Sequence, residues 1–348
     1  MTEGLRHPFD RPPEGAAAIR VAEGVLWLRI PLPMALDHVN CYALDDGDGW
    51  TLVDTGFRSD ATIALWQALI DGPLSGKPVR RLIVTHHHPD HIGLAGWFQA
   101  RGVELITTRT AWIYARMLVL DVQDRPTPQA MLFYTRAGLS PEQLTAKALE
   151  RPWNMADSVA PLPPGYTRIA EGDMIRAGGR NWLVRCGDGH APEHATLWSV
   201  EDGLVIGGDQ LLPGISANIG VHANEPGADP LGEWLDASRG FMAHARADQL
   251  VLPGHKLPFT GLPFRLRQMV DNHESALDRL RGHLAIARPA VACFPALFRR
   301  EIGAEVFGLA LGETIAHLNH LLHRGEVTRV LSDSGAWLWQ ALPDAAPP

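Results

Sequence analysis

The sequence has few cysteines and no long apolar run. Its three cysteines, Cys41, Cys186 and Cys293, are far apart and form no CxxC pair, which excludes a disulfide framework and favours a reducing compartment. Residues 1–13 are polar and contain prolines instead of an apolar leader. No stretch approaches the apolar length of a membrane span. We therefore expect a cytoplasmic protein without a membrane partner.

Lysine is also scarce, since only three of the 31 basic residues are lysines, and the net charge is −8. Nucleic-acid-binding proteins usually carry a basic face. The composition therefore disfavours a nucleic-acid partner, although a local basic groove stays open. The apolar share of 46% and the charged share of 20% are ordinary for a globular protein. The predominance of arginine and alanine is typical of a GC-rich bacterial genome.

Short apolar segments that alternate with helical patterns predict an α/β fold. The strands that matter most for function are expected at 79–84, 181–186, 204–206 and 249–252. The segment 110–160 is different, because it is helical in pattern, rich in Met, Leu and aromatic residues, and interrupted by prolines. Such an insertion can form a lid or a substrate wall.

A length of 348 residues fits one large domain and one smaller domain. We place the first domain at 1–262 and the second at 263–348. In the second, the pattern predicts helices and then two strands, at 263–281, 295–298, 304–311, 313–323, 327–330 and 336–339. Helices followed by a two-stranded hairpin are typical of a winged-helix-like module. Its simplest alternative is a packing module, which could also form a homodimer.

The residues with the clearest chemistry lie at 85–91, Thr-His-His-His-Pro-Asp-His, between a strand and a helix. His86 and His88 are two residues apart, so an extended backbone directs both to the same side. Asp90 and His91 begin the helix and aim at a neighbouring point. Imidazole and carboxylate groups are ligands for Zn²⁺ and similar divalent ions. The pattern therefore predicts a metal site, and a solvated polar loop is the alternative.

Three more residues of the same chemical type follow strands elsewhere in the chain. His190 follows the strand at 181–186, Asp209 follows 204–206 and His255 follows 249–252. Each comes after the C-terminal end of its strand, so one edge of a sheet could bring them together. Because these three residues could join the histidine cluster at 85–91, a metal site is the stronger interpretation of that cluster.

In this order of motifs the sequence resembles the metallo-β-lactamase superfamily over residues 19–260. The resemblance implies a four-layer αβ/βα sandwich with two metal ions. It implies that the first metal is bound by His86, His88 and His190. The second would be bound by Asp90, His91 and His255, with Asp209 bridging both. Asp54 would orient the ligands through hydrogen bonds, and Asp90 would also take up a proton during turnover.

The resemblance implies a dinuclear hydrolase that uses a metal-bound hydroxide. Zn²⁺ is the metal that we expect, with Mn²⁺ and Fe²⁺ as alternatives. A small-molecule thioester, ester or lactone is the favoured substrate, because the segment around 110–160 offers an apolar, aromatic wall, although the same residues could equally be core. The wall residues are Trp112, Tyr114, Met117, Leu118, Met131, Phe133, Tyr134 and Trp153.

Two other functions stay open. The C-terminal segment resembles the domain that follows the lactamase fold in a subfamily with a lactamase-like endoribonuclease, so a metal-dependent nuclease or phosphodiesterase is the alternative. Arginines that could grip phosphates are Arg265, Arg267, Arg279, Arg281, Arg299 and Arg300. A non-hydrolytic metal-binding or redox protein ranks last, because the sequence has no flavin domain. The roles of His194 and His222 are open, with a hydrogen-bonding role favoured for His194.

Overall fold

The computed structural model describes residues 4–343 and divides into two compact units, each built from separate segments of the chain. The first unit contains the residues up to 122, 153–217 and 242–266. The second contains 123–152, 218–241 and the residues from 267 on. The segment predicted as an insertion is therefore divided, with α4 (Arg109–Leu120) in the first unit and α5 (Pro128–Ala137) and α6 (Pro141–Leu149) in the second.

The first unit contains a seven-stranded sheet whose strands are neighbours in chain order. The strands from β1 to β4 pair antiparallel, whereas those from β4 to β7 pair parallel. Helices α1 (Asp60–Asp71) and α3 (Ala95–Gln99) lie in the crossovers of the parallel part. The strands are β1 (Ile19–Ala22), β2 (Val25–Pro31), β3 (His38–Asp45), β4 (Trp50–Val53), β5 (Val79–Ile83), β6 (Glu104–Thr108) and β7 (Thr167–Ile169).

A second sheet of five strands, in the order β12-β11-β10-β9-β8, completes this unit. Its pairs are antiparallel except for β11 and β12, which are parallel. Helix α7 (Pro230–Met242) lies between these two strands in the chain. The strands are β8 (Met174–Ala177), β9 (Arg180–Gly187), β10 (His194–Ser199), β11 (Leu204–Gly208) and β12 (Leu250–Pro253).

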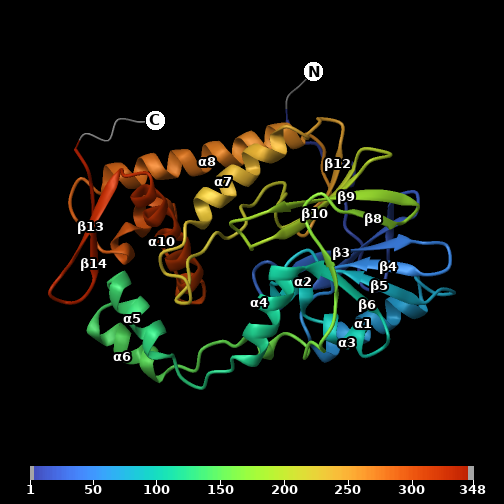
Figure 1. The fold of residues 1–348 in the computed structure, drawn as a ribbon, viewed down its shortest axis with the longest axis horizontal. Helices are drawn as coiled ribbons and strands as arrows, with labels where there is room; N and C mark the ends of the chain where they lie inside the picture. Colours follow the sequence, from blue (N-terminus) through green and yellow to red (C-terminus); the bar gives the residue numbers. More distant parts are fainter. Residues whose placement is uncertain (1–3, 344–348) are drawn as a thin grey trace. The chain divides into compact units, whose positions relative to one another are not determined.

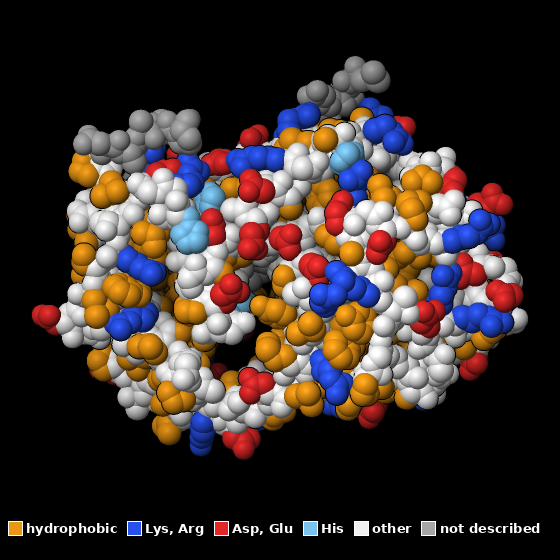
Figure 2. Space-filling model, in the orientation of Figure 1, with side chains coloured by type: hydrophobic (Ala, Val, Ile, Leu, Met, Phe, Trp, Pro, Cys, Tyr) orange, Lys and Arg blue, Asp and Glu red, His pale blue; other side chains and the backbone are white. Residues whose placement is uncertain are grey.

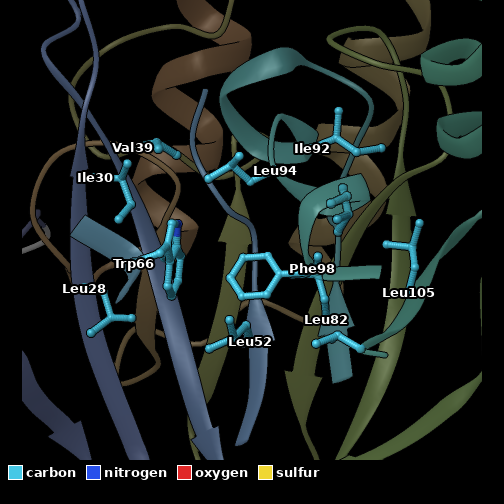
Figure 3. Packing of buried hydrophobic residues seen from close by; sticks show 14 of the residues in the cluster. Leu28, Ile30, Val39, Leu52, Trp66, Leu82, Ile92, Leu94, Phe98 and Leu105 are labelled. Atoms are coloured by element: carbon cyan, nitrogen blue, oxygen red, sulfur yellow. The ribbon is translucent and has the colours of Figure 1, made fainter. Parts of the chain in front are cut away.

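Two apolar cores hold these layers together. One lies between the sheets, where Trp27 of β2 and Trp182 of β9 are fully buried. The other lies on the opposite face of the first sheet, where Trp66 of α1 and Phe98 of α3 meet edge to face at 5.2 Å (Figure 3). Burial of an aromatic side chain contributes roughly 2–3 kcal/mol. Both faces of this sheet are therefore covered, which confirms the predicted α/β sandwich (Figure 1).

The second unit is mainly helical. It contains most of α8 (Leu262–His283), then α9 (Phe294–Leu297), α10 (Phe307–His323) and the hairpin of β13 (Val327–Leu331) and β14 (Trp337–Ala341). The short 3₁₀ turns η2 (Ala290–Cys293) and η3 (Ala304–Val306) also belong to it, whereas η1 (Met155–Asp157) belongs to the first unit. The winged-helix comparison stays a prediction.

The predicted break between helices at 304–311 and 313–323 is wrong, because α10 is continuous through Gly312. A Cβ at Gly312 would lie 3.2 Å from the carbonyl oxygen of Val221. Glycine here serves close packing of the helix against the 220–221 backbone, and it does not end the helix. Within residues 4–343, none of the helices combines the length and the apolar character that crossing a bilayer requires.

Candidate metal centre

The strand order brings five loops to one edge of the sandwich. Because β4 and β5 are parallel, the residues after them, from Asp54 and from Thr85 onward, emerge at the same edge. Asp209 and His255 likewise follow the parallel strands β11 and β12. The end of β9 meets the start of β10, since this pair is antiparallel. All of the predicted metal ligands belong to the first unit.

The first ligand group consists of His86, His88 and His190. His88 is the N-cap of the short helix α2 (Pro89–Ile92) and has extended backbone angles, so its ring turns to the same side as that of His86. His88 Nδ1 lies 3.0 Å from His86 Nε2 and 3.0 Å from His190 Nε2. One bound proton cannot satisfy three converging nitrogens. A tetrahedral Zn²⁺ with bonds of ~2.0 Å has edges of ~3.3 Å, so the spacing fits a cation.

Burial also prepares these rings to bind a metal. Loss of solvation lowers the pKa of both His86 and His88 well below the ordinary value of 6.5, and the neighbouring histidines lower it further. Both rings are therefore neutral at pH 7. A neutral imidazole offers a lone pair, which is the form that coordinates a metal ion.

The second group consists of Asp90, His91, Asp209 and His255, whose ligand atoms lie within 4.8 Å of one another. His91 Nε2 is 3.3 Å from Asp209 Oδ1, and His255 Nε2 is 3.3 Å from Asp90 Oδ2. These are ion-pair distances, but His91 Nε2, His255 Nε2 and Asp209 Oδ1 are buried without a well-directed hydrogen bond among residues 4–343. A cation at this point would satisfy all three atoms.

The acidic and basic side chains of the second group shift one another's pKa values. Burial opposes ionisation of His91, but the carboxylates of Asp209, Asp90 and Asp54 outweigh it and raise its pKa well above 6.5. The carboxylates of Asp209 and Asp90 outweigh burial at His255 and raise its pKa to about 10. Burial opposes ionisation of Asp209 too, yet His255 and His91 hold its pKa well below 3.8. Positive charge is thus favoured at this point, as a metal site requires.

Asp209 lies between the two groups. Its Oδ2 is 3.2 Å from His255 Nε2 and 3.6 Å from His190 Nε2. Because His190 belongs to the first group and His255 to the second, this one carboxylate faces both. Glycine makes room for it, since a Cβ at Gly254 would lie 2.2 Å from Asp209 Oδ1. The geometry fits a carboxylate shared by two cations.

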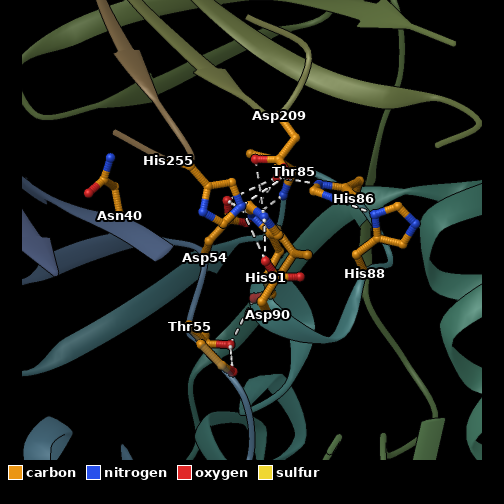
Figure 4. Close-up of polar contacts among 12 residues, drawn as sticks. Asn40, Asp54, Thr55, Thr85, His86, His88, Asp90, His91, Asp209 and His255 are labelled. Carbon is orange, nitrogen blue, oxygen red and sulfur yellow. Dashed lines mark hydrogen bonds and ion pairs between the residues drawn. The ribbon is translucent and has the colours of Figure 1, made fainter. Parts of the chain in front are cut away.

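Asp54 connects the two groups through hydrogen bonds (Figure 4). Its Oδ2 accepts from His91 Nδ1 at 2.8 Å and from the Thr85 hydroxyl at 2.9 Å. The Thr85 oxygen lies 3.0 Å from His86 Nδ1 and, with its proton given to Asp54, accepts from that nitrogen. Both rings therefore turn Nε2 towards the metal positions. Asp54 itself has φ of 61°, a strained backbone for a residue other than glycine.

His255 is oriented in a similar way from another strand. Its Nδ1 donates to the carbonyl oxygen of His38 at 2.6 Å, because a carbonyl can only accept. This fixes the tautomer and leaves Nε2 facing Asp90 and Asp209. Asn40 holds the same loop by donating to the carbonyls of Pro253 and Lys256 at 2.9 and 2.7 Å. The loop after β12 is therefore held by several hydrogen bonds where it carries His255.

The open question about His194 is answered by its contacts. His194 is fully buried, and its Nε2 accepts from the backbone N–H of Asp209 at 3.1 Å. The ring also stacks on His86, with 4.4 Å between centroids. His194 is therefore a hydrogen-bonded neighbour of the ligands. His87 turns away from His86 and packs against Tyr114 at 5.3 Å, while His222 belongs to the second unit.

Sequence reasoning missed three residues that orient the ligands, namely Thr85, His38 and Asn40. Thr85 is the first residue of the 85–91 motif, so its position after β5 offered a clue. His38 acts through its backbone carbonyl, which carries no residue-specific pattern. The predicted phosphate contact of Arg265 is wrong, because this side chain is buried and donates to the carbonyls of Leu212 and Ile215.

Comparison with known families agrees with this geometry. Residues 34–255 match the Metallo-beta-lactamase superfamily. Residues 277–342 match the family described as Metallo-beta-lactamase-like, C-terminal domain. The first match includes every candidate ligand, and the second lies within the helical C-terminal part.

Individual proteins are similar over nearly the whole chain. A probable metallo-hydrolase of Bacillus subtilis (strain 168), YqjP, is 28% identical over 317 residues, which are 86% of this chain and 92% of that protein. The structure of a beta-lactamase domain protein from Burkholderia ambifaria is 37% identical, with a TM-score of 0.88 over 97% of this chain and 98% of that one. A metallo-beta-lactamase family protein from Thermus thermophilus shares the fold at 23% identity, with a TM-score of 0.77 over 93% of this chain and 100% of that one.

Proposed function

Because this chain belongs to the metallo-β-lactamase superfamily and is a metal-dependent hydrolase, we propose that it holds two divalent cations and hydrolyses a thioester, ester or lactone. The observation that carries the proposal is the convergence of two ligand groups at one edge of the sandwich. They are His86, His88 and His190, and Asp90, His91, Asp209 and His255. Asp209 faces both groups and would be shared by the two cations.

The residues present fit two cations of intermediate hardness. Three neutral histidines suit Zn²⁺, which we expect in the first group, and the mixture of imidazole and carboxylate in the second also suits Mn²⁺ or Fe²⁺. When bound, such ions lower the pKa of water towards ~7 and polarise the oxygen under attack. The chain contributes the orientation of each ligand, through Asp54, Thr85 and the carbonyl of His38.

Asp90 is the residue that we propose for proton transfer. Its side chain is 16% exposed, whereas those of His91 and His255 are at most 1% exposed. It is therefore the member of the second group that substrate and solvent reach most easily. Its carboxylate can accept the proton that the attacking water loses and pass it to the leaving group. Asp54 is too deeply buried for that role and holds His91 instead.

An apolar substrate is favoured by helix α4. Tyr114 of this helix packs against His87, next to the first ligand group. The same helix exposes Ile113, Met117 and Leu120, which are 43–70% accessible and lie on one face. Two other residues of the predicted wall, Trp112 and Leu118, pack against the core, and Trp112 stacks on Tyr166 at 4.8 Å. The exposed face supports an organic acyl group as substrate.

The charge distribution gives the nuclease alternative little support. Basic and acidic side chains are interspersed on the face shown in Figure 2, where a nucleic-acid groove would need a run of basic ones. Among the predicted phosphate contacts, Arg265 is buried and Arg281 pairs with Asp278 and Glu326. Arg299 and Arg300 are exposed. The substrate panel below therefore includes nuclease and phosphodiesterase substrates, so that it also tests this alternative.

A substrate panel with matched variants tests the proposal. Purified protein loaded with Zn²⁺ or Mn²⁺ is assayed against thioesters, esters, lactones, phosphodiesters and single-stranded RNA. We expect turnover of an acyl substrate by the wild type and by His244→Ala, which changes an exposed histidine of the same unit. His88→Ala and Asp209→Asn should be inactive although folded. Full activity of the metal-free protein would contradict the metal mechanism, and turnover of only RNA or phosphodiesters would contradict the acyl substrate.

A further inference from the structure

The second unit contains a cavity of about 350 Å³, which we call the hairpin cavity. Its walls come from α5, α10, the 223–227 segment and the β13–β14 hairpin, all of which belong to this unit. The walls are mainly apolar and aromatic, with Leu132, Phe133, Ile315, Trp337 and Trp339 among them. This volume and lining are those of a small-molecule site. None of the candidate metal ligands lines the cavity.

The hairpin register explains how its side chains reach the cavity. Arg329 of β13 lies directly opposite Trp339 of β14, and Trp337 is two residues earlier on the same strand. Residues two apart on a strand, and residues opposite each other on paired strands, share one face. The guanidinium of Arg329 lies 4.7 Å from the ring of Trp337 and 5.0 Å from that of Trp339. Two indoles and one cation therefore form a single wall.

Arg329 has no counter-charge within the part of the chain that the structure describes. Among residues 4–343 its guanidinium makes no hydrogen bond and no ion pair, and it contacts the two indoles instead. Partial burial lowers its pKa, so its charge is incompletely solvated. The nearby Arg136 differs, because it donates to the carbonyl of Gly335 at 2.7 Å. The described residues that line the cavity include no aspartate or glutamate.

We propose that the hairpin cavity binds a small organic carboxylate with a flat or acyl apolar body. The carboxylate would pair with the free donors of Arg329, whose planar fork matches its two oxygens. The apolar body would lie against Trp337, Phe133 and Ile315. A nucleotide fits less well, because Gln129 is the only amide or hydroxyl side chain among the described lining residues and a base edge needs several partners. The proposal is independent of the reaction at the metal centre.

Calorimetric titration of the whole chain tests this site. The probes are 2-naphthoate and octanoate, with 2-naphthamide as a neutral analogue of the first. We expect both acids to bind the wild type. Arg329→Gln should weaken the binding of 2-naphthoate by tenfold or more and change the binding of 2-naphthamide little. Leu132→Trp, at a wall position that is 52% exposed, should weaken both acids by filling the cavity. Arg300→Gln, at an exposed arginine of the same unit, is the matched control.

Two further arms separate this site from the metal centre and from a nucleotide site. Removal of metal with a chelator, and the variant His88→Ala, should leave binding of the acids unchanged. The proposal is overturned if either treatment abolishes binding, or if Arg329→Gln binds 2-naphthoate as tightly as the wild type. It is also overturned if neither acid binds at millimolar concentration, or if adenosine monophosphate binds and the acids do not.

Discussion

The backbone N–H of Asp209 donates a hydrogen bond to Nε2 of His194 over 3.1 Å. The same imidazole stacks on His86, so one side chain supports residues of both ligand groups. Burial lowers the pKa of His194 to about 3, so the ring stays neutral and keeps its acceptor lone pair at every working pH. A residue that holds no metal can therefore control how two ligands are placed.

Replacement of His194 should weaken metal binding. His194→Ala leaves the N–H of Asp209 buried and unpaired, which costs about 1–3 kcal/mol of stability. We expect a 10–100-fold loss of metal affinity, because the shared carboxylate is no longer held. Competition with a chromophoric chelator measures the affinity, and thermal unfolding measures the stability. His244→Ala is the control. Wild-type affinity in His194→Ala would show that the hydrogen bond has no role in positioning.

Asp54 should matter through its charge as well as its shape. Asp54→Asn keeps the size of the side chain but replaces one acceptor oxygen by an N–H₂ group. An N–H₂ group only donates, so it cannot accept the hydrogen bonds that His91 and Thr85 give to the carboxylate. Misoriented rings should lower kcat by about 10²-fold or more, with a smaller effect on KM. Steady-state kinetics checks this, and circular dichroism checks the fold. Unchanged kcat in Asp54→Asn would contradict the orienting role.

The two ligand groups predict a metal stoichiometry. The wild type should hold two ions per chain by elemental analysis. His86→Ala should empty the first position and His255→Ala the second, so each variant should retain one ion. A chelator should remove both ions and lower the unfolding temperature, because metal bound to the folded state stabilises it. One ion per chain in the wild type would contradict the dinuclear proposal.

Glu313 in the second unit should give a measurable pH effect on stability. Burial raises its pKa to about 7, although Asn218 donates to it at 3.3 Å. The unfolded chain ionises this group near pH 4.5. Between these values the unfolded state has lost the proton that the folded state keeps, so the contribution of Glu313 to stability falls as the pH rises from 4.5 to 7. The difference corresponds to at most about 3 kcal/mol.

Glu313→Gln should remove this pH dependence. The variant should gain stability over the wild type at pH 8 and gain little at pH 4.5, as measured by urea unfolding at both values. Glu301→Gln, at an exposed glutamate of the same unit, should behave like the wild type. An equal change in stability at both pH values would show that folding does not raise the pKa of Glu313.

Much of the fold and of the ligand set could be predicted from the sequence, because both depend on local patterns. The buried apolar residues Leu82 and Ile83 at the end of β5 indicate a strand, and the histidines that follow it have the spacing of metal ligands. The short strands β7 and β8 were not predicted, since each has only three or four residues and at least half of them are exposed. Strand pairing stabilises them more than composition does.

The orienting contacts could not be predicted, because they join residues that are distant in sequence. His255 is fixed by a backbone carbonyl 217 positions away, and any residue could supply that group. The division of the 110–160 segment between two units likewise depends on contacts between residues that are distant in sequence. Gly138 ends α5 in a left-handed conformation and packs against Pro289, a tertiary contact without a local pattern.

Gly254 tests whether close packing of the backbone positions Asp209. A Cβ at this residue would lie 2.2 Å from Asp209 Oδ1 and 2.9 Å from His91 Cε1. In Gly254→Ala the carboxylate of Asp209 must move away from the new methyl group. The Asp209 side chain is flexible, so this movement costs little stability, but it takes the carboxylate away from the metal position. We therefore expect large losses of metal content and activity, with a change in unfolding free energy of about 1 kcal/mol.

Gly214→Ala provides the matched control, because nothing lies within 4 Å of a Cβ built at that glycine and it belongs to the same unit. Elemental analysis and kinetics on both variants separate a steric effect on Asp209 from a general cost of replacing glycine. If Gly254→Ala kept two ions and full activity, the carboxylate would not need the position that it has here. Loss of activity in both variants would instead indicate that backbone flexibility, rather than space beside Asp209, is what the enzyme requires.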